Sequence, residues 1–123
     1  MNSRSVWVRW HATRALAGLC DTRAIAPLID LLADDDASVR WEAARALGRL
    51  GPVVLDPLLQ ALSVREVTPW FAEGAARVLR RAGAGDLFPR LAGLERMLHH
   101  AMEAIAVPVE AARVREELRM LTG

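Results

Sequence analysis

The sequence predicts an all-α fold, a right-handed α-solenoid (superhelix) in which antiparallel helix pairs stack side by side. Two observations carry this prediction. One stretch occurs twice, as VRWHATRALAGLC at residues 8–20 and as VRWEAARALGRLG at residues 39–51. The composition, in which Ala and Leu dominate and 53% of residues are hydrophobic, favours helix over strand. A repeated helix-forming segment is typical of a stacked array.

The repeated stretch predicts one helix in each copy. Its apolar residues stand at i, i+4, i+7 and i+8, the spacing of one face of an α-helix. In the second copy these are Val39, Ala43, Ala46 and Leu47, and the first copy has the same residue at each position 31 residues earlier. A third copy, 32 positions later, continues the series with Phe71, Ala75, Val78 and Leu79. Each copy therefore has one apolar face to bury.

A second unit lies between these copies and predicts the other helix of each pair. It reads IAPLIDLL at 25–32, LDPLLQAL at 55–62 and, in weaker form, LFPRLAGL at 87–94, with prolines 30 and 32 residues apart. Asp21 or Thr22 can cap the first of these helices. The segment DDDAS (34–38) predicts the turn within a pair, and Gly51-Pro52 the turn between pairs.

The chain is expected to form one domain of about 3.5 repeats, because helix pairs of this length cannot bury their apolar faces alone and must stack. Its parts are a half-repeat (3–20), two repeats (21–51 and 52–83), and a degenerate C-terminal repeat with a capping helix (84–123). The opening half-repeat indicates either a fragment of a larger protein or an N-terminal cap.

The C-terminal part predicts two more helices, ERMLHHAMEAIAV (95–107) and a last one from Pro108. The last helix carries Val114, Leu118 and Leu121 on one stripe with Glu and Arg around it. It either closes the core or binds a partner.

The stretch AIAPLIDLLADDDASVRWEAARALGRLG (24–51) resembles the short bacterial HEAT repeats, often called phycobiliprotein-lyase HEAT-like repeats. The resemblance is specific over residues 5–83 and fades beyond them. In that family the Asp of the turn and the Arg that follows the Val typically bond between adjacent repeats. Asp36 and Arg40 stand at these two positions, so the resemblance implies the same role for them. Ala72 stands where the third copy should have this Arg, so we expect this ladder of bonds between successive repeats to stop there.

The resemblance also implies that the second helix of each pair lines a concave face. Trp41 lies about 180° from the centre of its helix's apolar stripe, at about 100° per residue. Read across the repeats, the residues on this side are Trp10, Trp41 and Glu73; His11, Glu42 and Gly74; and Arg14, Arg45 and Arg77, with Arg49 and Arg81 extending the last row. With helix axes about 8–10 Å apart, the two indoles are expected to touch.

These residues predict a non-enzymatic scaffold or adaptor module that binds a protein partner through its concave face. Trp and Arg are the side chains most enriched in binding hot spots. The alternative is structural, with the tryptophans packed together and the arginines paired with carboxylates such as Glu42 and Glu73.

Two enzymatic alternatives come from relatives of the repeat. Deoxyhypusine hydroxylases, which are HEAT-like, hold a di-iron centre with His-Glu pairs after the repeat's Arg, but Trp10-His11 and Trp41-Glu42 stand there in this chain. His99 and His100 are adjacent, and adjacent helical side chains point about 100° apart, which is poor for joint metal ligation. Bilin lyases are the other relatives, and no motif specific to chromophore transfer is present. We expect no catalytic residue, metal or cofactor.

Nucleic-acid binding is the third alternative, because HEAT-like alkylpurine glycosylases use a cationic concave face with tryptophans. The net charge of +1 and the absence of Lys argue against it. No apolar run reaches the roughly 20 residues that span a bilayer. The charged N-terminal segment and the single Cys20 favour a cytoplasmic protein over a secreted one.

Overall fold

The computed structural model describes residues 5–19, 21–83, 88–98 and 106–122. The helices are α1 (Val6–Leu19), α2 (Ile25–Leu31), α3 (Ala37–Leu50), α4 (Leu55–Val64), α5 (Pro69–Ala82), α6 (Phe88–Leu98) and α7 (Val107–Thr122). Two short 3-10 helices, η1 (Thr22–Ala24) and η2 (Gly51–Val54), lead into α2 and α4. The described residues contain no strand, so the all-α prediction is confirmed.

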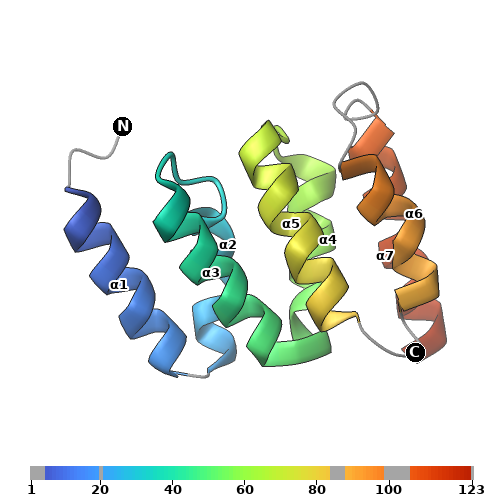
Figure 1. The fold of residues 1–123 in the computed structure, drawn as a ribbon. Helices are drawn as coiled ribbons and strands as arrows, with labels where there is room; N and C mark the ends of the chain where they lie inside the picture. The colour runs from blue at the N-terminus through green and yellow to red at the C-terminus, as the bar shows by residue number, and fades with distance from the viewer. Residues whose placement is uncertain (1–4, 20, 84–87, 99–105, 123) are drawn as a thin grey trace.

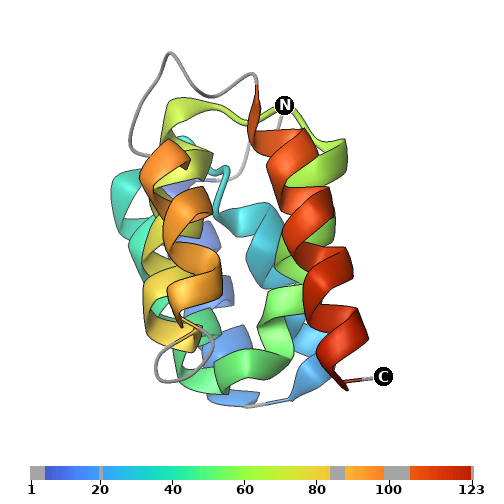
Figure 2. The ribbon, with the colours of Figure 1, turned by 90° about the vertical axis from the view of Figure 1, so that its right-hand side faces the viewer.

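The helices form two rows. Figure 1 shows α1, α3, α5 and α6 side by side, and Figure 2, turned by 90°, shows α2, α4 and α7 as a second row beside the first. Helix α3 packs on α1 and α5 within its row and on α2 across the rows. This stacking of helix pairs is the arrangement that the repeats predicted. The handedness of the superhelix and the number of repeats stay predictions.

Local sequence explains where the first-row helices begin. The Asp36 carboxylate accepts hydrogen bonds from the backbone N–H groups of Ser38 (2.9 Å) and Val39 (3.2 Å) at the start of α3. At the start of α5, the Thr68 hydroxyl accepts one from the backbone N–H of Phe71 (3.2 Å). Both caps satisfy N–H groups that have no partner within their helix.

The predicted turn residues also lie where their backbone preferences require. Gly51 follows α3 with a φ of 83°, a left-handed conformation that only glycine adopts without strain. Pro27 and Pro57 are each the third residue of their helix, α2 and α4. In the first turn of a helix the missing proline N–H leaves no helical hydrogen bond unmade.

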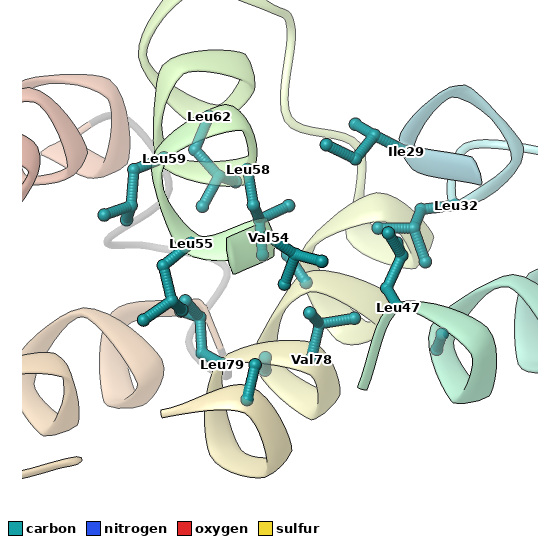
Figure 3. Packing of buried hydrophobic residues seen from close by; sticks show 14 of the residues in the cluster. Ile29, Leu32, Leu47, Val54, Leu55, Leu58, Leu59, Leu62, Val78 and Leu79 are labelled. Atoms are coloured by element: carbon teal, nitrogen blue, oxygen red, sulfur yellow. The ribbon is translucent and has the colours of Figure 1, made fainter. Parts of the chain in front are cut away.

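The hydrophobic core lies between the two rows. Figure 3 shows aliphatic side chains from α2, α3, α4 and α5 converging there. One leucine at the end of α2 and one in each of the other three helices are fully buried: Leu32, Leu47, Leu58 and Leu79. Each such burial stabilises the fold by about 1.5–3 kcal/mol relative to an exposed side chain. The apolar stripes that the sequence predicted therefore do meet in one core.

The C-terminal pair departs from the predicted order. The segment 87–94 was expected to repeat the first helix of each pair, which would place it in the row of α2 and α4. Instead α6 packs on α5 in the first row, and α7 packs on α4 in the second (Figure 2). Val107, Ala111 and Val114 of α7 are fully buried, so α7 supplies the apolar face that covers α4.

The two expected C-terminal helices also have different bounds. Residues 95–98 belong to α6, and most of the rest of the expected helix, residues 99–105, lies outside the described residues. The last helix begins at Val107, one residue before the predicted Pro108. Leu121, expected on the buried stripe, is exposed, whereas Leu118 is half-buried. Contact with α4 thus covers the first part of α7 better than its end.

The ion pair between successive repeats uses different residues from those predicted. Arg9 donates from Nε to Asp34 Oδ2 (2.8 Å) and from Nη2 to Asp35 Oδ1 (3.1 Å). Arg9 is only 8% exposed. Asp36, the predicted partner, caps α3 instead, because its position directly before the helix brings its carboxylate to the free N–H groups.

Arg40, the counterpart of Arg9, makes no such ion pair in the described structure. Its Nη1 donates to the backbone carbonyl of Asp34 (2.8 Å), and its guanidinium lies 5.4 Å from the Trp70 ring centre. The turn after α4, residues 65–68, has no Asp to take the place of Asp34. The ladder therefore stops one repeat earlier than predicted.

Candidate binding groove

A groove with a volume of about 450 Å³ lies between α3 and α5, on the first-row face that points away from the core. Its lining residues are Trp41, Ala44 and Arg45 of α3 and Glu73, Ala76, Arg77, Arg80 and Arg81 of α5. Five of them were predicted: Trp41, Arg45, Glu73, Arg77 and Arg81. The volume falls within the roughly 300–1,000 Å³ typical of ligand pockets.

The contact between Trp41 and Arg77 is the central feature of the groove. Trp41 is 47% exposed although it stands on a well-packed helix. The Arg77 guanidinium carbon lies 4.1 Å from the centre of the Trp41 ring, a cation–π contact between neighbouring helices. This contact holds the indole in place while leaving much of it open to solvent.

Small residues open the groove beneath the charged side chains. Ala44 and Ala76 are buried and line it between the larger groups. A Cβ added to Gly48 would lie 2.8 Å from Arg81 Cγ, so this glycine lets the Arg81 stem lie directly against α3. Sequence reasoning missed the alanines, because they were read only as helix-forming or core residues.

The groove has a positive charge, with four guanidinium groups and the single carboxylate of Glu73 among its lining residues. Arg45 lies 3.8 Å from a Glu42 oxygen, and Arg80 pairs at 3.1 Å with Glu95 of α6. Among the described residues no carboxylate pairs with Arg77 or Arg81. These two guanidinium groups therefore keep most of their hydrogen-bond donors available.

Arg80 was not predicted as a site residue. Its partner Glu95 is almost fully buried on α6. Glu95 was expected at the start of a separate helix (95–107) with no assigned packing partner, so no carboxylate was expected beside Arg80. The pair became visible only once α6 was seen to pack on α5.

Trp10, His11 and Arg14 form a separate cluster on α1. The Trp10 ring meets Trp7 edge to face at 6.0 Å and His11 at 5.1 Å, and the Arg14 guanidinium lies 5.0 Å from the Trp10 ring centre. In the described structure no ring contact joins Trp10 to Trp41, contrary to the expected pair of touching indoles.

The reason is local, because Trp7 and Arg14 stand one helical turn to either side of Trp10 and cover it first. Trp7 was missed by the sequence analysis. Its i, i+3 spacing from Trp10 was the signal that could have found it.

Two further predicted residues, Glu42 and Arg49, do not line the groove. Glu42 is half-buried beside Arg45, and Arg49 is exposed further along α3.

Within the described ranges, no three His, Cys, Asp or Glu side chains gather as a metal site would require, and His99 and His100 lie outside these ranges. None of the described helices combines the length and apolar character needed to cross a bilayer.

Comparison with known families finds a match to HEAT repeats over residues 1–80. The match ends within α5, so α6 and α7, where the helix order departs from the repeat, lie beyond it. No curated protein and no solved structure is detectably similar to the chain.

Proposed function

Because the chain belongs to the HEAT-repeat family, whose members are typically protein-interaction scaffolds, we propose that it is a non-enzymatic adaptor module that binds a protein partner. The binding site is the groove between α3 and α5, on the face that we expect to be concave. The observation that carries this proposal is the half-exposed Trp41 held under Arg77, with three further arginines around it.

The lining of the groove fits an acidic segment that also carries an apolar side chain. Arg77 and Arg81 can each form two parallel hydrogen bonds with an Asp or Glu of the partner. The space beside Ala44 and Ala76 admits an aliphatic or aromatic side chain against the Trp41 ring. Complementary charge would speed association and select the partner, and the apolar contact would supply most of the affinity.

A protein partner fits the charges of the molecule better than a nucleic acid does. Phosphate binding along a strand favours a broad basic surface. Here the net charge is +1, all sixteen basic residues are Arg, and a carboxylate, Glu73, lines the groove itself. A catalytic role is less well supported, because Ser, Thr, Cys and His are absent from the lining residues of this groove.

The test is selection of peptides from a random 12-residue phage-display library on the immobilised full chain. We expect the selected peptides to be enriched in Asp and Glu together with Leu or an aromatic residue. Their binding should weaken about 30-fold, or about 2 kcal/mol, in the Trp41→Ala variant. Arg77→Gln should weaken binding of the acidic peptides more than that of matched peptides with Gln and Asn in place of the acids.

Arg49→Ala is the matched control, because Arg49 is exposed on the same helix but outside the groove. It should leave peptide affinity unchanged. Selected peptides without acidic residues, or equal losses in the Arg49 and Arg77 variants, would contradict the proposal. Tight, steeply salt-dependent binding of single-stranded oligonucleotides without binding of acidic peptides would instead support the nucleic-acid alternative.

Thermal stability of the Trp41→Ala variant must be measured first. If Trp41 serves binding, its melting temperature should stay close to that of the unchanged chain. A loss of more than about 2 kcal/mol, the size of a core truncation, would show that the indole is structural.

A further inference from the structure

Side chains of α5 reach α3 at both ends of the groove between these helices. At one end the Arg77 guanidinium carbon lies 4.1 Å from the centre of the Trp41 ring. At the other end the aliphatic part of Arg81 lies against Gly48, where an added Cβ would be 2.8 Å from Arg81 Cγ and 3.2 Å from its Cβ and Cδ. A chain that followed the groove from end to end would have to displace these side chains.

The groove is also short, and its floor is apolar. Its lining residues on α5 run from Glu73 to Arg81, which at about 1.5 Å per residue is about 12 Å of helix. An extended peptide advances about 3.3 Å per residue, so the groove holds about three or four residues. Ala44 and Ala76 are buried and carry only methyl groups, which leaves room above them for an apolar side chain.

Two of the four guanidinium groups in the groove have a carboxylate close to them. A Glu42 oxygen lies 3.8 Å from Arg45, and a Glu95 oxygen lies 3.1 Å from Arg80. Both carboxylates belong to residues outside the lining of the groove. They offset the charge of these two arginines and leave the other two to interact with a ligand.

The other charges among the described lining residues are those of Arg77, Arg81 and Glu73. Two guanidinium groups beside one carboxylate leave a single positive charge in excess. One carboxylate of a ligand matches this excess, whereas a phosphate group carries about −1.5 to −2 charges near pH 7. The charge balance therefore favours a ligand that brings one carboxylate together with an apolar group.

We propose that the groove binds the C-terminal residue of the partner protein, with its main-chain carboxylate on Arg77 and Arg81 and its apolar side chain on Ala44 and Ala76. This proposal rests on the proposed function, because it names the part of the protein partner that occupies the groove. Arginine is well suited to hold a carboxylate, since its planar fork donates two parallel hydrogen bonds to the two oxygens.

A chain end fits the shape of the groove better than an internal segment does. The carboxylate and the side chain of a C-terminal residue leave the same Cα, so both reach a short groove together. The partner chain then leaves the groove once, and does not have to pass both crossed ends. In an extended internal segment, successive side chains point to opposite sides, so an acidic residue and its apolar neighbour would not both face the groove.

The test compares peptides with and without a free C-terminal carboxylate. Peptides in which the last four residues vary are arrayed with free C-termini and screened with the full chain. The tightest binders are made again as C-terminal amides, and both forms are titrated by fluorescence anisotropy. We expect Leu, Ile or Phe as the last residue. Amidation should weaken binding at least about tenfold, because it removes the charge that the guanidinium groups bind.

Variants of the two arginines show where the carboxylate lies. Arg77→Gln and Arg81→Gln should each weaken binding of the free-carboxylate peptides about tenfold and leave binding of the amides within about twofold. Retained binding of the amides also shows that these variants are folded. Arg49→Ala is the matched control, because Arg49 is exposed on α3 outside the groove, and it should change neither affinity.

Equal affinities for the peptides and their amides would overturn the proposal. Acidic peptides from the phage-display library that still bind would in that case leave the proposed function intact. Binding of N-acetyl-leucine as tight as that of the peptides would assign the groove to small carboxylic acids, and tighter binding of peptides with an internal phosphoserine would assign it to a dianion. Either result would overturn the proposal. If neither free-carboxylate nor acidic peptides bind, the proposed function is wrong as well.

Discussion

Segments 8–19 and 39–50 share eight residues in register and form the same kind of helix, α1 and α3, yet their side chains meet different surroundings. Arg9 is buried between two aspartates, whereas Arg40 reaches a backbone carbonyl and the face of Trp70. Val8 is half-exposed, whereas Val39 is fully buried. In a stacked array, a residue's environment therefore depends on which helices its repeat has as neighbours, and identical local sequence does not determine it.

The largest expected difference between the two copies concerns the leucine at their centre. Leu47→Ala should lower the free energy of unfolding by about 2–5 kcal/mol, because Leu47 is fully buried. Leu16→Ala should cost less than about half as much, since Leu16 is only partly covered. Urea denaturation of both variants gives the comparison, and Arg49→Ala, within about 0.5 kcal/mol of the unchanged chain, is the surface control. Equal losses at the two leucines would show that α1 is covered in solution.

The second-largest difference in stability is expected between variants of the matched arginines, Arg9 and Arg40. Arg9→Met leaves the Asp34 carboxylate, 9% exposed, without its guanidinium partner, and should destabilise the chain by about 3 kcal/mol. Arg40→Met removes one hydrogen bond to a backbone carbonyl and a cation–π contact, and should cost about 1 kcal/mol.

Adding Asp34→Asn to the Arg9→Met variant should recover part of the loss, because the neutral amide is less costly to bury than an unpaired carboxylate. Urea denaturation of the single and double variants measures this recovery. If the Arg9 and Arg40 variants lose equal stability, the buried ion pair is not what distinguishes the two repeats.

The matched valines provide a smaller difference. Val39→Ala should cost about 2 kcal/mol, the loss of two buried carbon atoms together with the cavity that remains. Val8→Ala should stay within about 0.5 kcal/mol, as for other exposed positions. Urea denaturation of the two variants gives the comparison, and equal costs at the two valines would show that Val8 is covered in solution.

The smallest expected difference concerns the two helix caps and depends on pH. Ser5 caps α1 through its hydroxyl, which accepts from the backbone N–H of Val8 at 3.4 Å. Asp36 caps α3, and the hydrogen bond from the Ser38 hydroxyl lowers the pKa of the Asp36 carboxyl below its usual 3.8, with smaller contributions from backbone N–H groups. A lowered pKa in the folded state means that the charged cap stabilises the fold above pH 3.8, and that this stabilisation is lost as the pH falls through the folded-state pKa.

The melting temperature of the unchanged chain should therefore fall more between pH 6 and pH 3 than that of the Asp36→Ser variant. The two drops should differ by about 2 °C or less. Ser5→Ala should lower the melting temperature by the same amount at both pH values, because a hydroxyl cap does not titrate in this range. Identical pH profiles for the Asp36→Ser variant and the unchanged chain would show that the carboxylate contributes nothing to the cap.

Five of the eight residues that line the candidate site could be predicted from the sequence. Trp41, Arg45 and Arg77 stand opposite an apolar stripe, and the phase of a helix fixes that position. Trp10 has the same phase but does not join the groove, because Trp7 and Arg14 of its own helix cover it. Helical phase thus indicates the side of the helix on which a residue lies, but not the neighbours it contacts there.

The C-terminal region shows a similar limit for the fold. The pattern LFPRLAGL (87–94) correctly indicates a helix, and its likeness to 25–32 suggested the second row. The structure places α6 beside α5 and gives the second-row position to α7. Both helices have an apolar stripe, and a stripe of aliphatic residues can pack against either row.

The amino-acid sequence was sufficient to predict the helices as far as α5, the turns between them, and the HEAT-repeat family. These features depend on residues within about one helical turn of each other or on the spacing of the repeat. Only the tertiary structure decided that Arg9 and not Arg40 is buried in an ion pair, that α6 lies on α5, and that the groove forms at Trp41 and not at Trp10. Each of these outcomes depends on which distant side chain occupies the facing position, because burial and ion pairing are properties of contacts between helices.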